Sequence, residues 1–290
     1  MHSHYLQVFP PIPINVARYI TVLSTRLTAY ATLQNHVSAL RKFYTLSGFL
    51  LDTTHPVIDI LLKSLKRQMS AASKPKAPLT PEQIVLISHI IDSSDPKQFT
   101  FYVALLIHFF SIVRKSNLLP PSKSSYSKFK HLSRGNVMIT ESCLVLTLPW
   151  TKTLQAGEDI FTLPIAAVPD SVIDPVASYK QLVERFPVPN DFPAFSYSDG
   201  NNIHILTQND YVQLLKNSLQ KLNIPSQAYS SHSVRRGGAS LMHQAQVPVS
   251  LIKHQGTWKS DCYQKYLCFN HDQKLIPTLK MQHFINNMFK

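Results

Sequence analysis

One tyrosine and several hydrogen-bond-donating side chains lie close together near the C-terminal end of the sequence. His232 and Arg235 are three residues apart, and Tyr266 follows ten residues after Gly256. Residues three apart on a helix share one face, so His232 and Arg235 can contact the same ligand. A guanidinium can give two parallel hydrogen bonds to a phosphate, and an imidazole adds another donor. The pattern predicts a phosphate site with a tyrosine beside it.

Two basic residues earlier in the chain favour the same chemistry. Arg114 follows the apolar stretch 98–113, and an arginine at the end of so apolar a helix must find an anion or reach solvent. Lys152 lies in the turn Trp150-Thr151-Lys152-Thr153 between two expected strands. Taken alone, Arg114 could equally be an ordinary surface arginine that follows a core helix. Lys152, taken alone, could equally be a solvent-exposed lysine at the tip of a hairpin.

The chemistry that needs such a set is attack on a phosphodiester. Tyrosine is a weak nucleophile at neutral pH, so the negative charge that develops on the phosphate oxygens must be offset by fixed donors. Arginines can do this electrostatic work, and we therefore expect no metal ion and no other cofactor. The sequence has no paired carboxylates or His and Cys ligand spacing that would indicate a metal site.

Together these residues resemble the active site of the tyrosine recombinases, also called the phage-integrase family. Members carry an arginine after a buried helix, a hairpin lysine, often as Thr-Lys-Thr, a His-x-x-Arg step and a nucleophilic tyrosine ten residues after a glycine. The resemblance covers residues 14–70 and 80–290. It implies that Tyr266 is the nucleophile, that Lys152 protonates the departing 5′ oxygen, and that the phosphate donors are Arg114, His232, Arg235 and Trp258.

The sequence departs from the family pattern at several positions. Asn117 stands where the family has an acidic residue that supports the first arginine. Thr257 occupies the position of the family's histidine, and Trp258 follows it. We favour Trp258 as the donor, because an indole N–H can donate to a phosphate oxygen. Tyr263 is a rival nucleophile, but its spacing from Gly256 does not fit the family, so we interpret it as a packing residue.

Composition and charge indicate a globular protein with a polyanionic partner. The 290 residues carry a net charge of +13 and are 44% hydrophobic. Residues 1–80 hold nine Lys or Arg against two acids, whereas residues 81–290 hold twenty against fourteen. Such a balance suits nucleic-acid backbones. Three cysteines without a Cys-x-x-Cys pair argue against a disulfide framework, and no signal peptide or membrane-length apolar run is found.

The N-terminal part is predicted to be helical. Helical periodicity begins at Ile14, resumes after Thr32, and begins again at Pro56. Residues 70–79 have the composition of a linker, and the run Thr80-Pro81-Glu82-Gln83 predicts a helix start with a capping box. We therefore expect a helical core-binding domain that clamps DNA over 1–75 and a catalytic domain over 76–290.

The second domain is predicted to be α+β. Residues 98–113 are apolar on nearly all sides and predict a central buried helix. Short runs at 137–140, 144–149 and 160–164 predict a small antiparallel sheet, and helices are expected at about 174–186 and 208–222. The small residues Gly237 and Gly238 would let another backbone approach. The expected fold class is mainly α with a small antiparallel β-sheet.

The resemblance implies a site-specific DNA recombinase or integrase that cleaves and rejoins DNA through a 3′-phosphotyrosyl intermediate. Its partners would be double-stranded DNA and further copies of itself, without a membrane. The Arg-Lys-Ser-Asn-Leu variant is most similar to recombinases of eukaryotic, Crypton-like mobile elements, which implies a nuclear location; otherwise we expect the cytoplasm with the nucleoid. The family's usual first helix is missing, which suggests truncation or a decayed element. A catalytically silent DNA-binding protein and a type IB topoisomerase stay open as alternatives.

Overall fold

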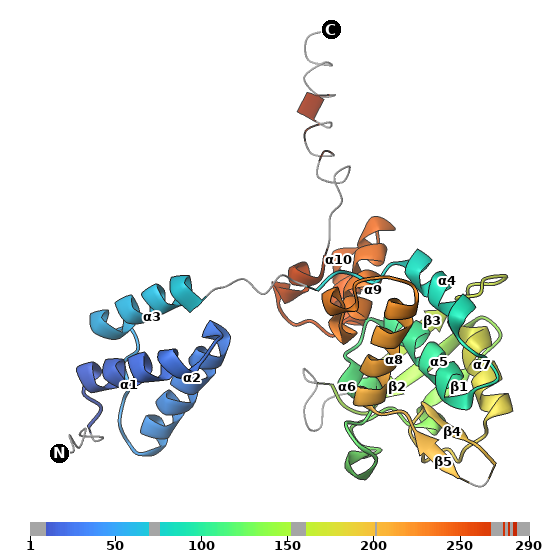
Figure 1. Ribbon diagram of the computed structural model, residues 1–290, viewed down its shortest axis with the longest axis horizontal. Helices are drawn as coiled ribbons and strands as arrows, with labels where there is room; N and C mark the ends of the chain where they lie inside the picture. Colours follow the sequence, from blue (N-terminus) through green and yellow to red (C-terminus); the bar gives the residue numbers. More distant parts are fainter. Residues whose placement is uncertain are drawn as a thin grey trace. The chain divides into compact units, whose positions relative to one another are not determined.

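The chain divides into two compact units, Met1–Pro75 and Lys76–Lys290 (Figure 1). The structure is a computed structural model. It describes residues 10–69, 76–151, 161–200 and 202–267, together with 275, 278, 281 and 282. Each unit has its own hydrophobic core, and they are treated in turn.

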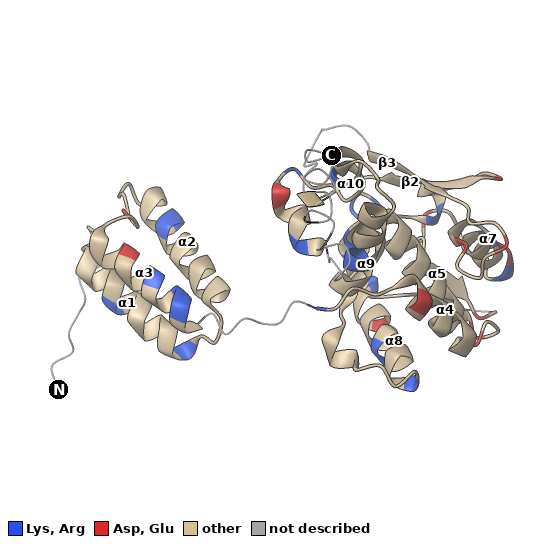
Figure 2. Cartoon of the chain, turned by 90° about the horizontal axis from the view of Figure 1, so that it is seen from above, with Lys and Arg blue, Asp and Glu red and all other residues tan. Residues whose placement is uncertain are grey.

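Three helices form the first unit, as the periodicity predicts. They are α1 (Pro13–Arg26), α2 (Tyr30–Leu46) and α3 (Pro56–Met69). Proline at the first position suits α1 and α3, because its missing N–H has no partner there in any helix. The helices bury Ile20, Leu33 and Ile58 completely against one another. All three helices contain Lys or Arg residues, which are blue in Figure 2.

The second unit opens with the predicted capping box. Helix α4 (Pro81–Ile90) begins after Thr80, whose hydroxyl accepts from the Gln83 N–H at 3.3 Å. In return, the Thr80 N–H donates to the Gln83 side-chain oxygen at 3.1 Å. Two donors that the first turn of a helix leaves unpaired are thereby satisfied.

Helix α5 (Pro96–Ser111) is the centre of the second unit, and twelve of its sixteen residues are buried. Other helices surround it (Figure 1). They are α6 (Lys115–Leu118), α7 (Pro175–Arg185), α8 (Gln208–Lys221), α9 (Ser231–Gln244) and α10 (Val249–Gln255). The unit also contains four short 3-10 turns among its described residues, at Lys123–Ser125, Arg134–Asn136, Ser226–Ala228 and Asp261–Tyr266. The last of these turns is η4. Within the described parts of the chain, no helix has the length and apolar character needed to span a bilayer.

A three-stranded antiparallel sheet packs beside α5 and α7, which confirms the predicted fold class. Its strands, in the order β1-β2-β3, are β1 (Val137–Ile139), β2 (Cys143–Leu148) and β3 (Phe161–Ala166). Alternate side chains of β2 and β3 are buried, as expected for a sheet with one face in the core. A second hairpin, β4 (Ser196–Ser198) and β5 (Ile203–Ile205), was not predicted, because three residues are too few to show a period.

Helix α9 lies very close to neighbouring backbone at its glycine pair. A Cβ added to Gly237 would stand 1.8 Å from the Leu79 carbonyl oxygen, and one added to Gly238 would stand 2.1 Å from the Phe109 carbonyl oxygen. These distances leave no room for a side chain. The close approach expected from the glycines is therefore present, and it fixes α9 against α5.

Substitution Gly237→Ala should destabilise the second unit. The methyl group would force backbone atoms apart, which costs about 3 kcal/mol in a packed interior. Urea unfolding followed by tryptophan fluorescence measures this selectively, because both tryptophans, Trp150 and Trp258, lie in this unit. The exposed Gln244→Ala in the same helix is the control and should change the unfolding free energy by less than about 0.5 kcal/mol. Equal effects of the two substitutions would contradict the close approach.

Candidate active site

A left-handed residue at the end of α5 sends the chain toward the site. Ile112 is fully buried and has φ 47°, and Arg114 follows in extended conformation as the N-cap of α6. The prediction that the helix continues to residue 113 was wrong, because Ile112 stops it. A β-branched residue in this conformation costs roughly 1 to 3 kcal/mol, so the surrounding core must hold it there.

Arg114 and Asn117 make contacts that the sequence did not predict. The Nη1 of Arg114 donates to the Thr257 hydroxyl at 3.2 Å. Asn117 is buried, and its amide donates to the Trp150 carbonyl at 2.6 Å. Asn117 therefore ties α6 to the end of the segment that leads to Lys152, which itself lies outside the described residues.

Arg235 is a buried cation without an acidic partner among the described residues. Its side chain is 1% exposed, and its Nη2 donates to the Gly256 carbonyl at 2.6 Å. Its Nε and Nη1 have no hydrogen-bond partner in the part of the chain that the structure describes. Burial lowers the pKa of Arg235 to about 10, against the opposing effect of Tyr266, so the guanidinium stays charged at neutral pH. A buried charge of this kind calls for an anion.

Trp258 packs against both Arg235 and Tyr266. Its ring centroid is 4.1 Å from the guanidinium carbon of Arg235 and 5.1 Å from the Tyr266 ring centroid. Gly256 caps α10 with φ −81°, and an added Cβ would stand 2.0 Å from the Trp258 ring. The left-handed turn falls on Thr257, at φ 52°. Gly256 thus leaves room for the indole ring of Trp258. That ring in turn packs against the Tyr266 ring and the Arg235 guanidinium.

Tyr266 lies near three of the other predicted residues, namely His232, Arg235 and Trp258. The guanidinium carbon of Arg235 is 5.2 Å from its ring centroid, and the His232 ring centroid is 6.2 Å away. Ser240 of α9 donates to the Tyr266 backbone carbonyl at 3.2 Å, which fixes η4 against that helix. Tyr263 is buried and packs toward Trp258, with ring centroids 6.5 Å apart.

A cavity of about 150 Å³ opens between α5, α6 and α9. No carboxylate is among the side chains that line it within the described part of the chain. They are His108, Arg114, Lys115, Ser116, Ser231, His232 and Arg235. Arg114, His232 and Arg235 thus share one cavity, and Trp258 and Tyr266 both contact Arg235. Five of the six predicted site residues are brought together.

Sequence reasoning missed four residues that line this cavity, and two of them, His108 and Lys115, are ionisable. His108 is 1% exposed, and its Nδ1 lies 2.9 Å from the Tyr211 hydroxyl. Burial lowers the pKa of His108 to about 3, and the charges of Arg235 and His232 act in the same direction. The pKa of His232 is also lowered, chiefly by the partial burial of its own ring and further by the charges of Arg235 and Lys115. Both imidazoles are therefore neutral at pH 7. A lone histidine within so apolar a helix was the available signal.

Comparison with known proteins identifies the fold. No family model matches the sequence, and no curated protein matches it. The structure is similar to the XerH site-specific recombinase in a post-cleavage complex with palindromic difH substrate, at 15% identity over 93% of this chain and 72% of that chain, with a TM-score of 0.63. It is also similar to the Tn1549 transposon integrase in complex with transposon right-end DNA, at 15% identity over 96% of this chain and 87% of that one, with a TM-score of 0.58. The XerA recombinase matches at 14% identity over 96% and 85%, with a TM-score of 0.50. The chain has the fold of the tyrosine recombinases.

Substitution His108→Gln should reduce the sensitivity of the fold to acid. His108 is neutral in the folded state and takes up a proton only after unfolding, so below its ordinary pKa of 6.5 the unfolded state binds more protons and stability falls as the pH falls toward 3. Between pH 7 and pH 5, protonation of His108 in the unfolded state lowers the free energy of unfolding by about 2 kcal/mol. Urea unfolding at both pH values should therefore show a decrease that is about 2 kcal/mol smaller in the variant than in the unaltered chain. An unchanged loss would mean that His108 is not held neutral.

Proposed function

We propose that this protein is a site-specific DNA recombinase or integrase that breaks and rejoins DNA through a 3′-phosphotyrosyl intermediate. The observation that carries the proposal is Arg235, a buried cation with two unpaired N–H groups directly beside the Tyr266 ring. A phosphate held by those N–H groups would stand next to a phenol oxygen. The tyrosine recombinase fold supports the same reaction.

The proposed reaction begins when a phosphodiester enters the cavity. Arg235 and Arg114 hold its non-bridging oxygens, and the fixed guanidinium groups offset the charge that develops as the phenol oxygen of Tyr266 attacks phosphorus. The neutral His232 ring, beside Tyr266, can accept the phenol proton. The bond from phosphorus to the 5′ oxygen breaks, and Lys152 is proposed to protonate that oxygen.

Rejoining reverses these steps. The 5′ hydroxyl of another strand gives its proton to Lys152, which cleavage left neutral, and attacks phosphorus. The bond from phosphorus to the Tyr266 oxygen breaks, and the protonated His232 returns the proton to that oxygen. Because the covalent intermediate keeps the energy of the cleaved bond, no ATP is consumed. The proposed scheme therefore needs only the chain and its DNA, with no cofactor.

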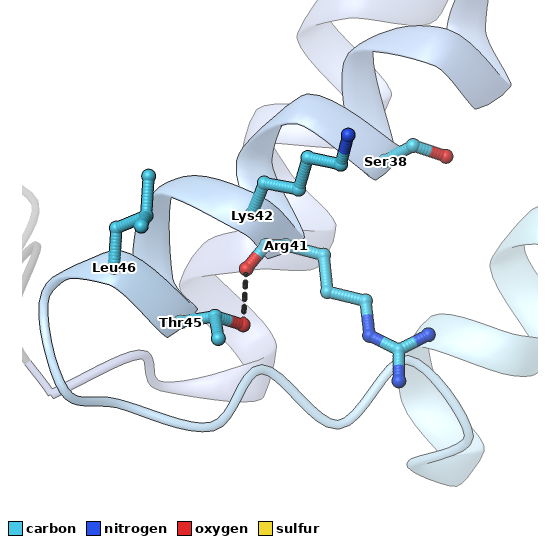
Figure 3. Close-up of a pocket in the computed structure, with 5 residues that line it drawn as sticks. All are labelled: Ser38, Arg41, Lys42, Thr45 and Leu46. Atoms are coloured by element: carbon cyan, nitrogen blue, oxygen red, sulfur yellow. Dashed lines mark hydrogen bonds between the residues drawn. The ribbon is translucent and has the colours of Figure 1, made fainter. Parts of the chain in front are cut away.

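The first unit is proposed to clamp the duplex. A groove of about 460 Å³ lies on α2 and is lined by Ser38, Arg41, Lys42, Thr45 and Leu46 (Figure 3). Thr45 donates to the Arg41 carbonyl at 3.0 Å, while the basic groups of Arg41 and Lys42 extend into solvent. Cationic and hydroxyl side chains on one helix face suit contacts to a phosphate backbone.

The assembly and the location are part of the same proposal. The matched XerH and Tn1549 proteins are recorded in complexes with DNA, which supports duplex DNA as the partner. Exchange of strands between two sites requires more than one nucleophile, so we expect a homo-oligomer on DNA. A nuclear location follows if the chain derives from a Crypton-like eukaryotic element, and a location with the nucleoid follows otherwise.

A catalytically silent DNA-binding protein derived from a recombinase is the second candidate. It is favoured by Asn117, which stands in the place of the family's acidic residue. The Asn117 amide donates to the Trp150 carbonyl, and Asn117 carries no charge that could support Arg114. This candidate predicts salt-sensitive DNA binding without covalent attachment. A type IB topoisomerase would instead relax supercoils as a monomer.

A covalent trapping assay tests the proposed function. Nicked duplexes from a random pool are incubated with the protein, denatured and examined for protein attached to DNA. The unaltered chain and Tyr263→Phe should form the adduct, whereas Tyr266→Phe should form none, because the Tyr266 ring lies beside Arg235, with its centroid 5.2 Å from the guanidinium carbon. Salt-sensitive DNA binding without any adduct would favour the catalytically silent DNA-binding protein. An adduct that is lost in Tyr263→Phe alone would identify Tyr263 as the nucleophile in place of Tyr266.

A further inference from the structure

Lys115 is a cation of the cavity that the resemblance did not assign. It is the first residue of α6, directly after Arg114, and it lines the cavity with Arg114, His232 and Arg235. The residue is half-buried, and burial lowers the pKa of its ammonium group. This ammonium makes no hydrogen bond or ion pair with the described residues. A desolvated cation that points into a shared cavity requires a ligand.

The position of Lys115 is fixed by its helix. Its backbone carbonyl accepts from the Leu119 N–H at 2.8 Å, and Leu118 and Leu119 are both 1% exposed. The buried amide of Asn117 fixes the same turn to the Trp150 carbonyl. The Lys115 side chain therefore starts from a rigid base, as a group with a fixed role in a site does.

The cavity holds more positive charge than a resting phosphodiester can offset. Arg114, Lys115 and Arg235 carry three positive charges, and no carboxylate is among the described lining residues. The same charges act on the pKa values of the site: the pKa of Arg235 is lowered first by burial and then by Arg114, and the pKa of His232 is lowered first by burial and then by Arg235 and Lys115. A phosphodiester carries one negative charge, whereas the state formed during attack carries a second on its non-bridging oxygens. A cavity with three cations favours that state over the resting one.

We propose that Lys115 is a further catalytic residue, whose ammonium contacts a non-bridging oxygen of the scissile phosphate together with Arg114 and Arg235. Arg114, Lys115 and Arg235 line one cavity of about 150 Å³, so a phosphate held there is within reach of all three cations. This inference rests on the proposed function. It assigns Lys115 an electrostatic role, separate from the proton transfer proposed for Lys152.

The test compares cleavage of two duplexes that differ only at the scissile position, one with the natural phosphodiester and one with a methylphosphonate. A methylphosphonate lacks one charged non-bridging oxygen, so a cation that contacts that oxygen loses its advantage. Single-turnover adduct formation is measured for the unaltered chain, Lys115→Met and the control Lys180→Met, which removes an exposed lysine of α7. Circular dichroism and thermal melting verify that both variants fold.

On the phosphodiester, Lys115→Met should cleave about 100-fold more slowly than the unaltered chain, whereas Lys180→Met should cleave at an unchanged rate. On the methylphosphonate in which the contacted oxygen is replaced, the deficit of Lys115→Met should shrink to less than about threefold. A deficit that persists on both methylphosphonate stereoisomers would overturn the proposed contact. A deficit that disappears only when the leaving 5′ oxygen is replaced by sulfur, which needs no proton, would make Lys115 the proton donor and overturn the electrostatic role.

Two other outcomes are distinguishable. Equal cleavage by Lys115→Met and the unaltered chain on the phosphodiester would overturn the role of Lys115 and leave the recombinase function intact. Absence of any adduct with the unaltered chain would overturn the recombinase function, and the inference with it.

Discussion

The rest of the candidate site depends on one buried positive charge. Arg235 lies inside the second unit at 1% exposure, with two N–H groups that find no partner. Removing a guanidinium from water without an acid beside it costs several kcal/mol, so such a group lowers stability unless a ligand fills the space. In the proposed function, a phosphate bound by Arg235 would pair these two N–H groups and offset part of that cost.

The surrounding fold keeps that charge buried and oriented. The glycine pair of α9 brings the helix of Arg235 against the backbone of Leu79 and Phe109. Gly256 leaves room for the Trp258 ring, whose centroid lies 4.1 Å from the guanidinium carbon of Arg235. The Gly256 carbonyl accepts a hydrogen bond from the Nη2 of Arg235. The left-handed turn at Ile112 then directs Arg114 toward the same cavity. Glycines and a strained turn thus place two arginines within one small cavity.

Local rules in the sequence predicted a large part of this arrangement. The capping box at Thr80 and the shared face of His232 and Arg235 depend only on residues a few positions apart, and both are present. The close approach at Gly237 could also be expected, because only a small residue permits it. The three-stranded sheet was predicted from its β-branched and leucine-rich runs and is present, with β3 ending at Ala166, two residues beyond the expected end.

The remaining features depend on contacts between distant segments, which no local pattern encodes. Lys115 was read only as part of a family-like run, and its place in the cavity follows from where α6 packs. Asn117 could not be paired with Trp150 from the sequence, because the two residues are thirty-three positions apart. Trp258 was expected to donate to phosphate, yet its ring contacts with Arg235 and Tyr266 show that it also forms part of the packing of the site.

The most direct test of the central claim is a crystal structure of Tyr266→Phe bound to a duplex that the protein selects from a random pool. The account predicts that oxygens of a single phosphate lie about 3 Å from both Nε and Nη1 of Arg235, with the ring at position 266 facing that phosphorus. A DNA complex in which those two N–H groups contact only water or protein, and the phosphates lie outside the cavity, would contradict it.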